Sequence, residues 1–125
     1  GKPTAVLLTR GDRYAAELLE ELRERTPGIQ ILCAGKLPSG TAEKLSLRDA
    51  LAPAERRGRG NAYARGGWWL HDRILTDTAL TVIRADVFAR RDLLDPRSGT
   101  PLPTYRRQRY TGGIGRYFPI FLYIK

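Results

Sequence analysis

Short apolar runs separated by polar segments occupy the first part of the chain. TAVLLT (residues 4–9) is rich enough in aliphatic side chains to predict a buried strand, and IQILCA (residues 29–34) predicts a second. Between them, apolar positions recur at helical spacing, which predicts an amphipathic helix. These positions are Ala15, Leu18, Leu19 and Leu22.

Polar residues mark the limits of this helix. Asp12 can cap its first turn, and Pro27 with Gly28 ends it. Glu21 and Arg25 stand one turn apart on the solvent-facing side, so we expect an ion pair between them.

The following segments have weaker patterns. TAEKLSLRDAL (residues 41–51) is expected to form one or two helical turns, with Thr41 or Ser39 as the cap. Residues 52–67 (APAERRGRGNAYARGG) have no apolar period and are dense in Gly and Arg. This composition predicts a surface loop within the domain.

The clearest pattern is a pair of strand-like runs. WWLHDRILT (residues 68–76) and ALTVIRADVFAR (residues 79–90) are separated only by Asp77 and Thr78, which predicts an antiparallel hairpin.

The chain closes on GRYFPIFLYIK (residues 115–125), which predicts a last strand. Pro119 places that strand at a sheet edge or delays its start. The order of strand, helix, strand and further strands predicts one α+β domain over residues 1–125. We expect a mostly antiparallel sheet with one or two helices packed on it.

Composition narrows the setting of the protein. The only cysteine, Cys33, lies in an apolar run, which predicts a buried thiol in a reducing compartment. No run approaches the ~18 apolar residues of a membrane span, and no signal-peptide pattern is present, so we expect a cytoplasmic protein without membrane contact. No residue spacing predicts a metal site or a cofactor. The absence of methionine leads us to expect a neighbouring domain outside this sequence, with a homodimer as the other option.

The net charge of +9 is concentrated in two segments, ERRGRGNAYAR and PTYRRQRYTGGIGRYF. Arginine supplies 18 of the 22 basic residues. This preference for arginine over lysine fits bidentate recognition of phosphate or carboxylate groups. The alternative explanation is a coding bias, which produces the same composition.

The predicted hairpin carries two candidate ligand-binding arginines. Because alternate residues of a strand share a face, Arg73 and Arg84 can point from adjacent strands into one space. A buried guanidinium needs an anionic partner, since an unpaired buried charge is costly. A ligand carboxylate would supply it, and pairing with Asp72, Asp86 or Asp92 is the alternative.

The same run contains the only histidine, His71. Histidine exchanges protons near neutral pH, so His71 is either a general base or an ordinary strand residue. The run also resembles the HxKxxxxD motif of phospholipase D-like enzymes, with Arg73 in place of Lys and Thr78 in place of Asp. No second copy exists, which implies at best an inactive or dimer-completed relative. Trp68 and Trp69 are expected to pack rather than to recognise a ligand.

Over residues 6–94 the chain is similar, by pattern rather than by identities, to the chorismate lyase superfamily, which includes the ligand-sensing domain of bacterial winged-helix repressors. The matching segments are VLLTRGDRYAAELLEEL, IQILCAGKLPSGTAEKLSL and LHDRILTDTALTVIRADVFARRDLL, and the tail RRQRYTGGIGRYFPIFLYI resembles the ending of the repressor branch.

This resemblance implies an enclosed pocket for a small carboxylated ligand. Lyase members cleave chorismate to 4-hydroxybenzoate and pyruvate without a cofactor, using arginines and a late-strand glutamate. Arg73 and Arg84 match the arginines, the first within one residue of register, and His71 would be an accessory polar group. GRYFPIFLYIK contains no acid to match the glutamate. We therefore expect binding of an anionic, aromatic carboxylate ligand, and lyase activity stays open.

Nucleic-acid binding, alone or as a subunit of a larger nucleoprotein assembly, is the alternative function. Basic residues interleaved with aromatic ones suit phosphates and bases respectively, and glycines 112, 113 and 115 allow close backbone approach to a phosphate. A solvated cationic surface without function is the third interpretation. The candidate residues are Arg56, Arg57, Arg59, Arg65, Arg106, Arg107, Arg109, Arg116, Tyr105 and Tyr110.

Overall fold

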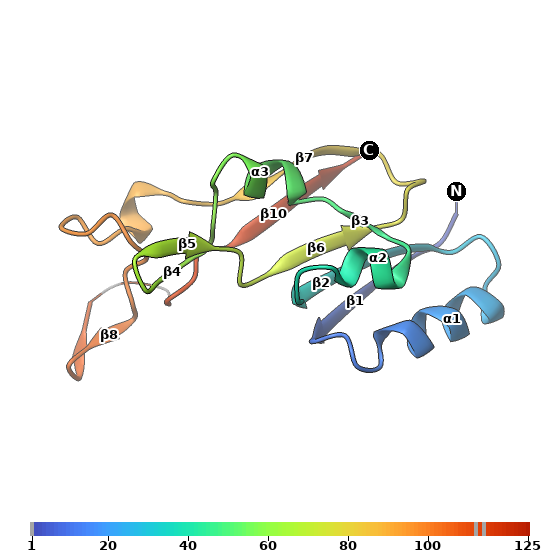
Figure 1. The fold of residues 1–125 in the computed structure, drawn as a ribbon, viewed down its shortest axis with the longest axis horizontal. Helices are drawn as coiled ribbons and strands as arrows, with labels where there is room; N and C mark the ends of the chain where they lie inside the picture. The colour runs from blue at the N-terminus through green and yellow to red at the C-terminus, as the bar shows by residue number, and fades with distance from the viewer. Residues whose placement is uncertain (1, 112, 114) are drawn as a thin grey trace.

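A central sheet with the strand order β1–β2–β6–β3 organises the chain in the computed structural model, which describes residues 2–111, 113 and 115–125 (Figure 1). Parallel strands β1 (Thr4–Arg10) and β2 (Gln30–Lys36) are joined by helix α1 (Ala15–Arg25). Strand β6 (Arg73–Thr76) runs antiparallel to β2 on one side and to β3 (Arg48–Asp49) on the other.

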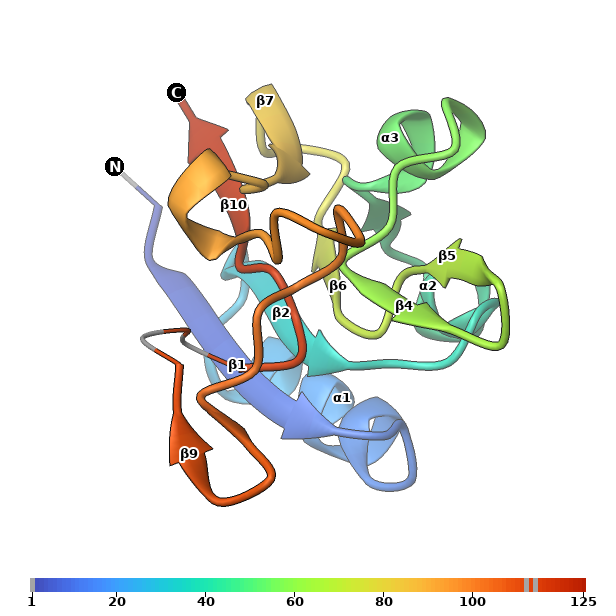
Figure 2. The same cartoon turned by 90° about the vertical axis from the view of Figure 1, so that its left-hand side faces the viewer.

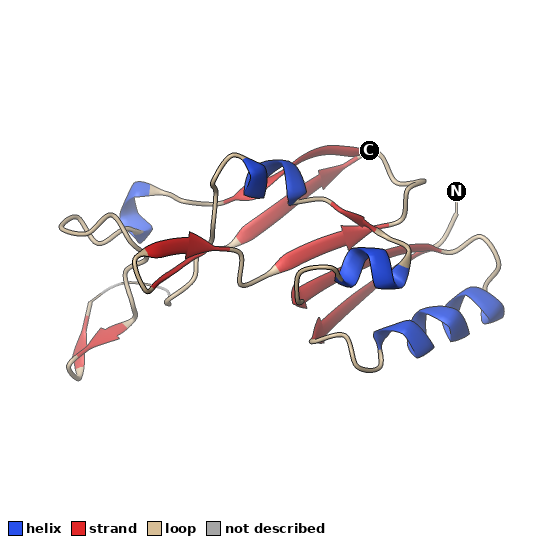
Figure 3. Cartoon of the chain, viewed as in Figure 1, coloured by secondary structure: helices blue, strands red, loops and turns tan. Residues whose placement is uncertain are grey.

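The second layer is the antiparallel pair of β7 (Val82–Val87) and β10 (Ile120–Ile124). Figure 3 distinguishes the strands, drawn in red, from the helices, drawn in blue. With one parallel pair among otherwise antiparallel partners, the fold is α+β, as expected. The remaining elements are α2 (Thr41–Leu45), α3 (Ala52–Arg56), β4 (Ala62–Ala64), β5 (Gly67–Trp69), β8 (Tyr105–Arg106), β9 (Arg109–Tyr110) and a 3₁₀ turn at Arg91–Leu93. In the described part of the chain, no helix has the length and apolar character needed to span a membrane.

Helix α1 follows the sequence pattern closely. Ala15 and Leu19 are buried against the sheet, and the expected Glu21–Arg25 ion pair forms at 2.7 Å. The predicted cap is wrong, because Tyr14 occupies the N-cap position and no side chain caps the helix. The Asp12 carboxylate instead accepts a hydrogen bond from Lys44 at 2.9 Å, which ties the loop before α1 to α2.

The two faces of the central sheet are covered unequally. Helix α1 packs over Ile31 and Cys33, so the predicted burial of the thiol is confirmed. The β7–β10 pair covers the opposite face of β2 and β6 but leaves β1 uncovered. Val6 and Leu8 are therefore 63% and 77% exposed, and the expectation of a buried strand is wrong for this edge strand.

The predicted hairpin across Asp77 and Thr78 does not form. Strand β6 pairs with β2 and β3, while β7 pairs with β10. Asp77 holds the end of β6 on β2, since its backbone N–H donates to the Ile31 carbonyl and its carboxylate accepts from the Ile31 N–H. The run WWLHDRILT is also divided, because Trp69 ends β5 and the chain bends at residues 71–72 before β6 begins.

Three other local expectations have mixed outcomes. Residues 52–67 are not simply a surface loop, because they contain α3, β4 and the fully buried Asn61. Gly40, with a φ of 90°, occupies the N-cap position of α2 instead of Thr41 or Ser39. The late start of the last strand is confirmed, since β10 begins directly after Pro119.

Candidate ligand-binding pocket

Polar residues from three strands meet at one edge of the central sheet. Arg10 and Lys36 are the last residues of β1 and β2, and they are register partners. Strand β6 runs the opposite way, so its first residue, Arg73, lies at the same edge, opposite Gly35. The carboxyl ends of parallel strands are a common place for ligand sites in sheets with helical connections.

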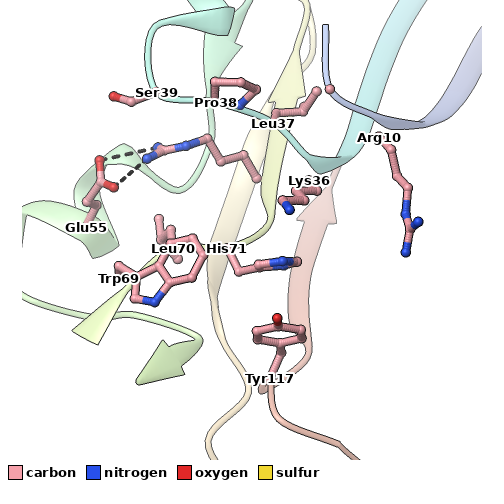
Figure 4. A pocket seen from close by; sticks show the side chains of 12 residues that line it. Arg10, Lys36, Leu37, Pro38, Ser39, Glu55, Trp69, Leu70, His71 and Tyr117 are labelled. Carbon is pink, nitrogen blue, oxygen red and sulfur yellow. Dashed lines mark hydrogen bonds and ion pairs between the residues drawn. The ribbon is translucent and has the colours of Figure 1, made fainter. Parts of the chain in front are cut away.

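A pocket of about 730 Å³ opens at this edge (Figure 4). Its apolar lining includes Leu37 and Leu70, both buried, and its aromatic lining comes from Trp69, His71 and Tyr117. The volume lies within the range of about 300–1,000 Å³ that is usual for small-molecule sites. The pocket thus has the size and mixed lining of a site for a small organic ligand.

The cations at the pocket differ in whether their charge is already matched. In the part of the chain that the structure describes, Arg10 and Lys36 form no ion pair. The only carboxylate among the described lining residues, Glu55, is bound to Arg73. Arg10 and Lys36 therefore supply the unmatched positive charge of the pocket.

Arg73 is a buried cation paired with two less buried carboxylates. Its guanidinium donates from Nη1 to Asp49 Oδ2 at 2.8 Å and from Nη2 to Glu55 Oε2 at 2.6 Å. Burial opposes the charge of the guanidinium, but the hydrogen bonds to Glu55 and Asp49 outweigh it, so the pKa of Arg73 is raised. Of the three guanidinium nitrogens of Arg73, Nε has no hydrogen-bond partner among the described residues. Arg73 thus holds β6 to α3 and β3.

His71 belongs to an aromatic wall. Its ring stacks on Tyr117, with centroids 3.9 Å apart and planes 14° apart, and it meets Trp69 edge-on at 5.3 Å. The Nδ1 atom lies 3.2 Å from Asp72 Oδ1 but without the alignment of a hydrogen bond. The wall presents flat surfaces suited to packing against a ring.

Asn61 fixes the position of this wall. This buried side chain accepts a hydrogen bond from the His71 backbone N–H at 2.7 Å through Oδ1. Its Nδ2 donates to Asp72 Oδ2 at 2.8 Å and to the Phe118 carbonyl at 3.1 Å. Because Tyr117 precedes Phe118, one asparagine sets both partners of the His71–Tyr117 stack.

Arg84 is not brought to the pocket, and the predicted pairing of Arg73 with Arg84 is wrong. The Arg84 side chain is 65% exposed on β7, lies 5.4 Å from the Phe121 ring centroid and is 3.9 Å from Asp86. The error follows from the hairpin, because β6 and β7 do not pair. The alternative partners, Asp72, Asp86 or Asp92, are confirmed for Arg84, which pairs with Asp86, and are wrong for Arg73, which pairs with Asp49 and Glu55.

The candidate nucleic-acid residues fall into two groups. In the first segment, Arg57 and Arg59 lie 3.9 and 3.1 Å from Asp86, which matches part of their charge. Arg56 ends α3, and Arg65 lies in the turn between β4 and β5 with a φ of 53°.

In the second segment, Arg106 is bound to Asp95, and the other candidates are exposed. Tyr105 and Tyr110 face each other in the β8–β9 hairpin. Of the glycines expected near a phosphate, Gly112 lies outside the described residues.

Comparison with known proteins found no matching family model, curated protein or solved structure. The chorismate lyase-like resemblance therefore stays a prediction. The pocket residues that sequence reasoning missed are Arg10, Lys36, Trp69 and Tyr117. A signal for the first two was present, because Arg10 directly follows the first predicted strand of a strand–helix–strand unit and Lys36 follows the second after one glycine.

Proposed function

We propose that this protein binds a small anionic ligand, best an aromatic carboxylate, in the pocket at the carboxyl ends of β1 and β2. The observation that carries the proposal is the position of Arg10 and Lys36 at a pocket with an aromatic wall, since these register partners form no ion pair with any described residue. Like charges on neighbouring strands repel each other. A bound carboxylate relieves this repulsion and accepts charge-assisted hydrogen bonds.

The apolar lining favours an aromatic body over a simple inorganic anion. Leu37 and Leu70 offer buried aliphatic surface, and the His71–Tyr117 stack offers flat rings. A ligand with its carboxylate at Arg10 and Lys36 would lay its ring along these surfaces. This arrangement differs from the expected one in its arginines, since Arg73 supports the pocket and Arg84 has no part in it.

The proposed role is binding or sensing rather than lyase chemistry. Glu55, the one carboxylate among the described lining residues, accepts two hydrogen bonds from Arg73 at 2.6 and 3.3 Å. Both oxygens of this carboxylate are engaged by Arg73, so its role in the described structure is to hold the pocket wall. Ligand recognition needs no free carboxylate.

A matched pair of ligands tests the proposal. Binding of 4-hydroxybenzoate and of its uncharged analogue 4-hydroxybenzamide is measured by isothermal titration calorimetry, beside chorismate and glucose 6-phosphate. We expect the carboxylate to bind at least about tenfold more tightly than the amide, since a hydrogen bond to a charged group contributes about 1.5–3 kcal/mol.

Two variants locate the binding. Arg10→Ala/Lys36→Ala should abolish the preference for the carboxylate, whereas Arg84→Ala, a charge removed elsewhere on the surface, should leave it intact. Equal binding of the amide and the acid, or unchanged binding by the double variant, would contradict the proposal.

A further inference from the structure

The β8–β9 hairpin projects from the body of the protein. Figure 1 shows it at the lower left, and Figure 2 shows it from that side. Its strands pair Tyr105 with Tyr110 and Arg106 with Arg109 across a two-residue turn. Because directly opposite residues share a face, the tyrosines lie on one face of the ribbon and these two arginines on the other.

The two tyrosines form an exposed aromatic platform. Their ring centroids are 5.8 Å apart in an edge-on arrangement, and the residues are 63% and 70% exposed. Neither belongs to a buried apolar cluster of the described residues. The aromatic surface of Tyr105 and Tyr110 is therefore available to a partner.

The segment of chain that carries this platform is basic. Residues 96–125 contain six basic residues and no acidic residue. Asp95, the acid nearest in sequence, is bound to Arg106 at 2.5 Å, which anchors the base of the hairpin. In the described part of the chain, Arg107 and Arg109 form no ion pair. The hairpin thus presents exposed rings on one face, with the unmatched charge of Arg109 on the other face and that of Arg107 at the tip.

The turn itself is made of residues that do not favour it. Arg107 and Gln108 both have positive φ, 49° and 65°, in a position where Asn-Gly is the preferred pair. Positive φ costs about 1 kcal/mol or more for a residue with a Cβ atom. Turn stability alone therefore does not account for an arginine at the tip.

We propose that the β8–β9 hairpin is a contact arm for single-stranded nucleic acid. Arg107 and Arg109 meet phosphates, and Tyr105 and Tyr110 stack on bases. A single strand fits better than a duplex, because stacking on an exposed ring requires bases that are not already stacked within a helix. This function is separate from the proposed ligand pocket and rests on different residues.

Fluorescence anisotropy of a labelled oligothymidine, titrated with the full chain at several KCl concentrations, tests the arm. Tyr105→Ala/Tyr110→Ala should weaken binding by at least about tenfold, since stacking contributes about 1–3 kcal/mol per base, without changing the salt dependence. Arg107→Ala/Arg109→Ala should reduce the slope of log K against log [KCl] by about 1.4, since each phosphate contact in a single strand contributes about 0.7.

The chain offers a matched control for these changes. Arg13 and Tyr14 are also an adjacent, exposed Arg–Tyr pair, with the guanidinium 5.2 Å from the ring centroid, but they lie before α1. Arg13→Ala/Tyr14→Ala should bind like the wild type, and Arg109→Ala/Tyr110→Ala should not. Equal losses in the two variants would overturn the proposal.

A further variant separates lost contacts from a lost hairpin. Arg107→Asn/Gln108→Gly installs preferred turn residues while removing one charge. Its binding should still weaken when Tyr105 and Tyr110 are replaced, and the slope of log K against log [KCl] should fall by about 0.7.

The proposal is overturned if a duplex binds as tightly as the single strand and the Tyr105→Ala/Tyr110→Ala variant binds both as tightly as the wild type does. Competition by polyglutamate as strong as that by unlabelled oligothymidine would overturn it equally. Binding of 4-hydroxybenzoate should be unchanged in every hairpin variant, which keeps this test distinct from that of the pocket.

Discussion

Replacing Asn61 with alanine removes three hydrogen bonds from the structure that supports the pocket. The His71 N–H, the Asp72 carboxylate and the Phe118 carbonyl each lose a partner, at 2.7, 2.8 and 3.1 Å respectively. Asp72 is partly exposed and regains contact with water, whereas the bond to Phe118 is buried and the bond to His71 is partly buried.

The expected loss of stability follows from these unsatisfied groups. An orphaned buried donor or acceptor costs about 1–3 kcal/mol, so two of them give a loss of about 2–6 kcal/mol in the free energy of unfolding. This is a large part of the about 5–15 kcal/mol that keeps a typical domain folded. In molecules that stay folded, His71 and Tyr117 are no longer held together, so binding of 4-hydroxybenzoate should also weaken.

Urea-induced unfolding followed by far-ultraviolet circular dichroism measures the change. Gln108→Ala is the control, because it removes an exposed amide that makes no hydrogen bond within the described residues, and its effect should stay below about 0.5 kcal/mol. A loss below about 1 kcal/mol for Asn61→Ala would refute the argument that this side chain organises the pocket wall.

Other substitutions and a pH series probe the surrounding structure. Arg73→Leu should lower the free energy of unfolding by about 1.5–3 kcal/mol in the same urea assay, because Asp49, 18% exposed, loses its charged partner while Glu55, 44% exposed, is solvated by water. Gly35→Ala should prevent β1 from pairing with β2, because the Cβ of the alanine would lie 1.9 Å from the Thr9 carbonyl oxygen and the φ at this position is 141°. Loss of the cooperative thermal unfolding transition checks this. Burial raises the pKa of the Cys33 thiol, so stability should fall as pH rises above about 8.5, where the unfolded thiol ionises, and Cys33→Ala should remove this slope.

Sequence patterns predicted the elements whose signals are local. The strand, helix and strand of residues 4–36 follow from an apolar run, a helical repeat and a second apolar run, and β10 follows from a run that begins after Pro119. In each case neighbouring residues carry the information. The degree of burial was less predictable, because exposure of Leu8 depends on β10 covering β2 and not β1.

The predicted hairpin failed because strand pairing is not a local property. All four residues of β6 are buried, and burial on both faces suits a central strand between β2 and β3 better than one half of a hairpin. The partners of Arg73 lie 18 and 24 residues away in sequence, so spacing within the run could not reveal them. The unmatched charge of Arg10 and Lys36 likewise depends on which acids the fold places elsewhere.

A titration of ¹⁵N-labelled protein with 4-hydroxybenzoate tests the proposed anion site most directly. The chain has two tryptophans, and only Trp69 lines the pocket; Trp68 stacks on Phe118 at 5.7 Å. The Trp69 indole N–H signal should move in a saturable way while that of Trp68 stays still, and Arg10→Ala/Lys36→Ala should abolish the change. If neither signal moves, or both move equally, the ligand does not bind in this pocket.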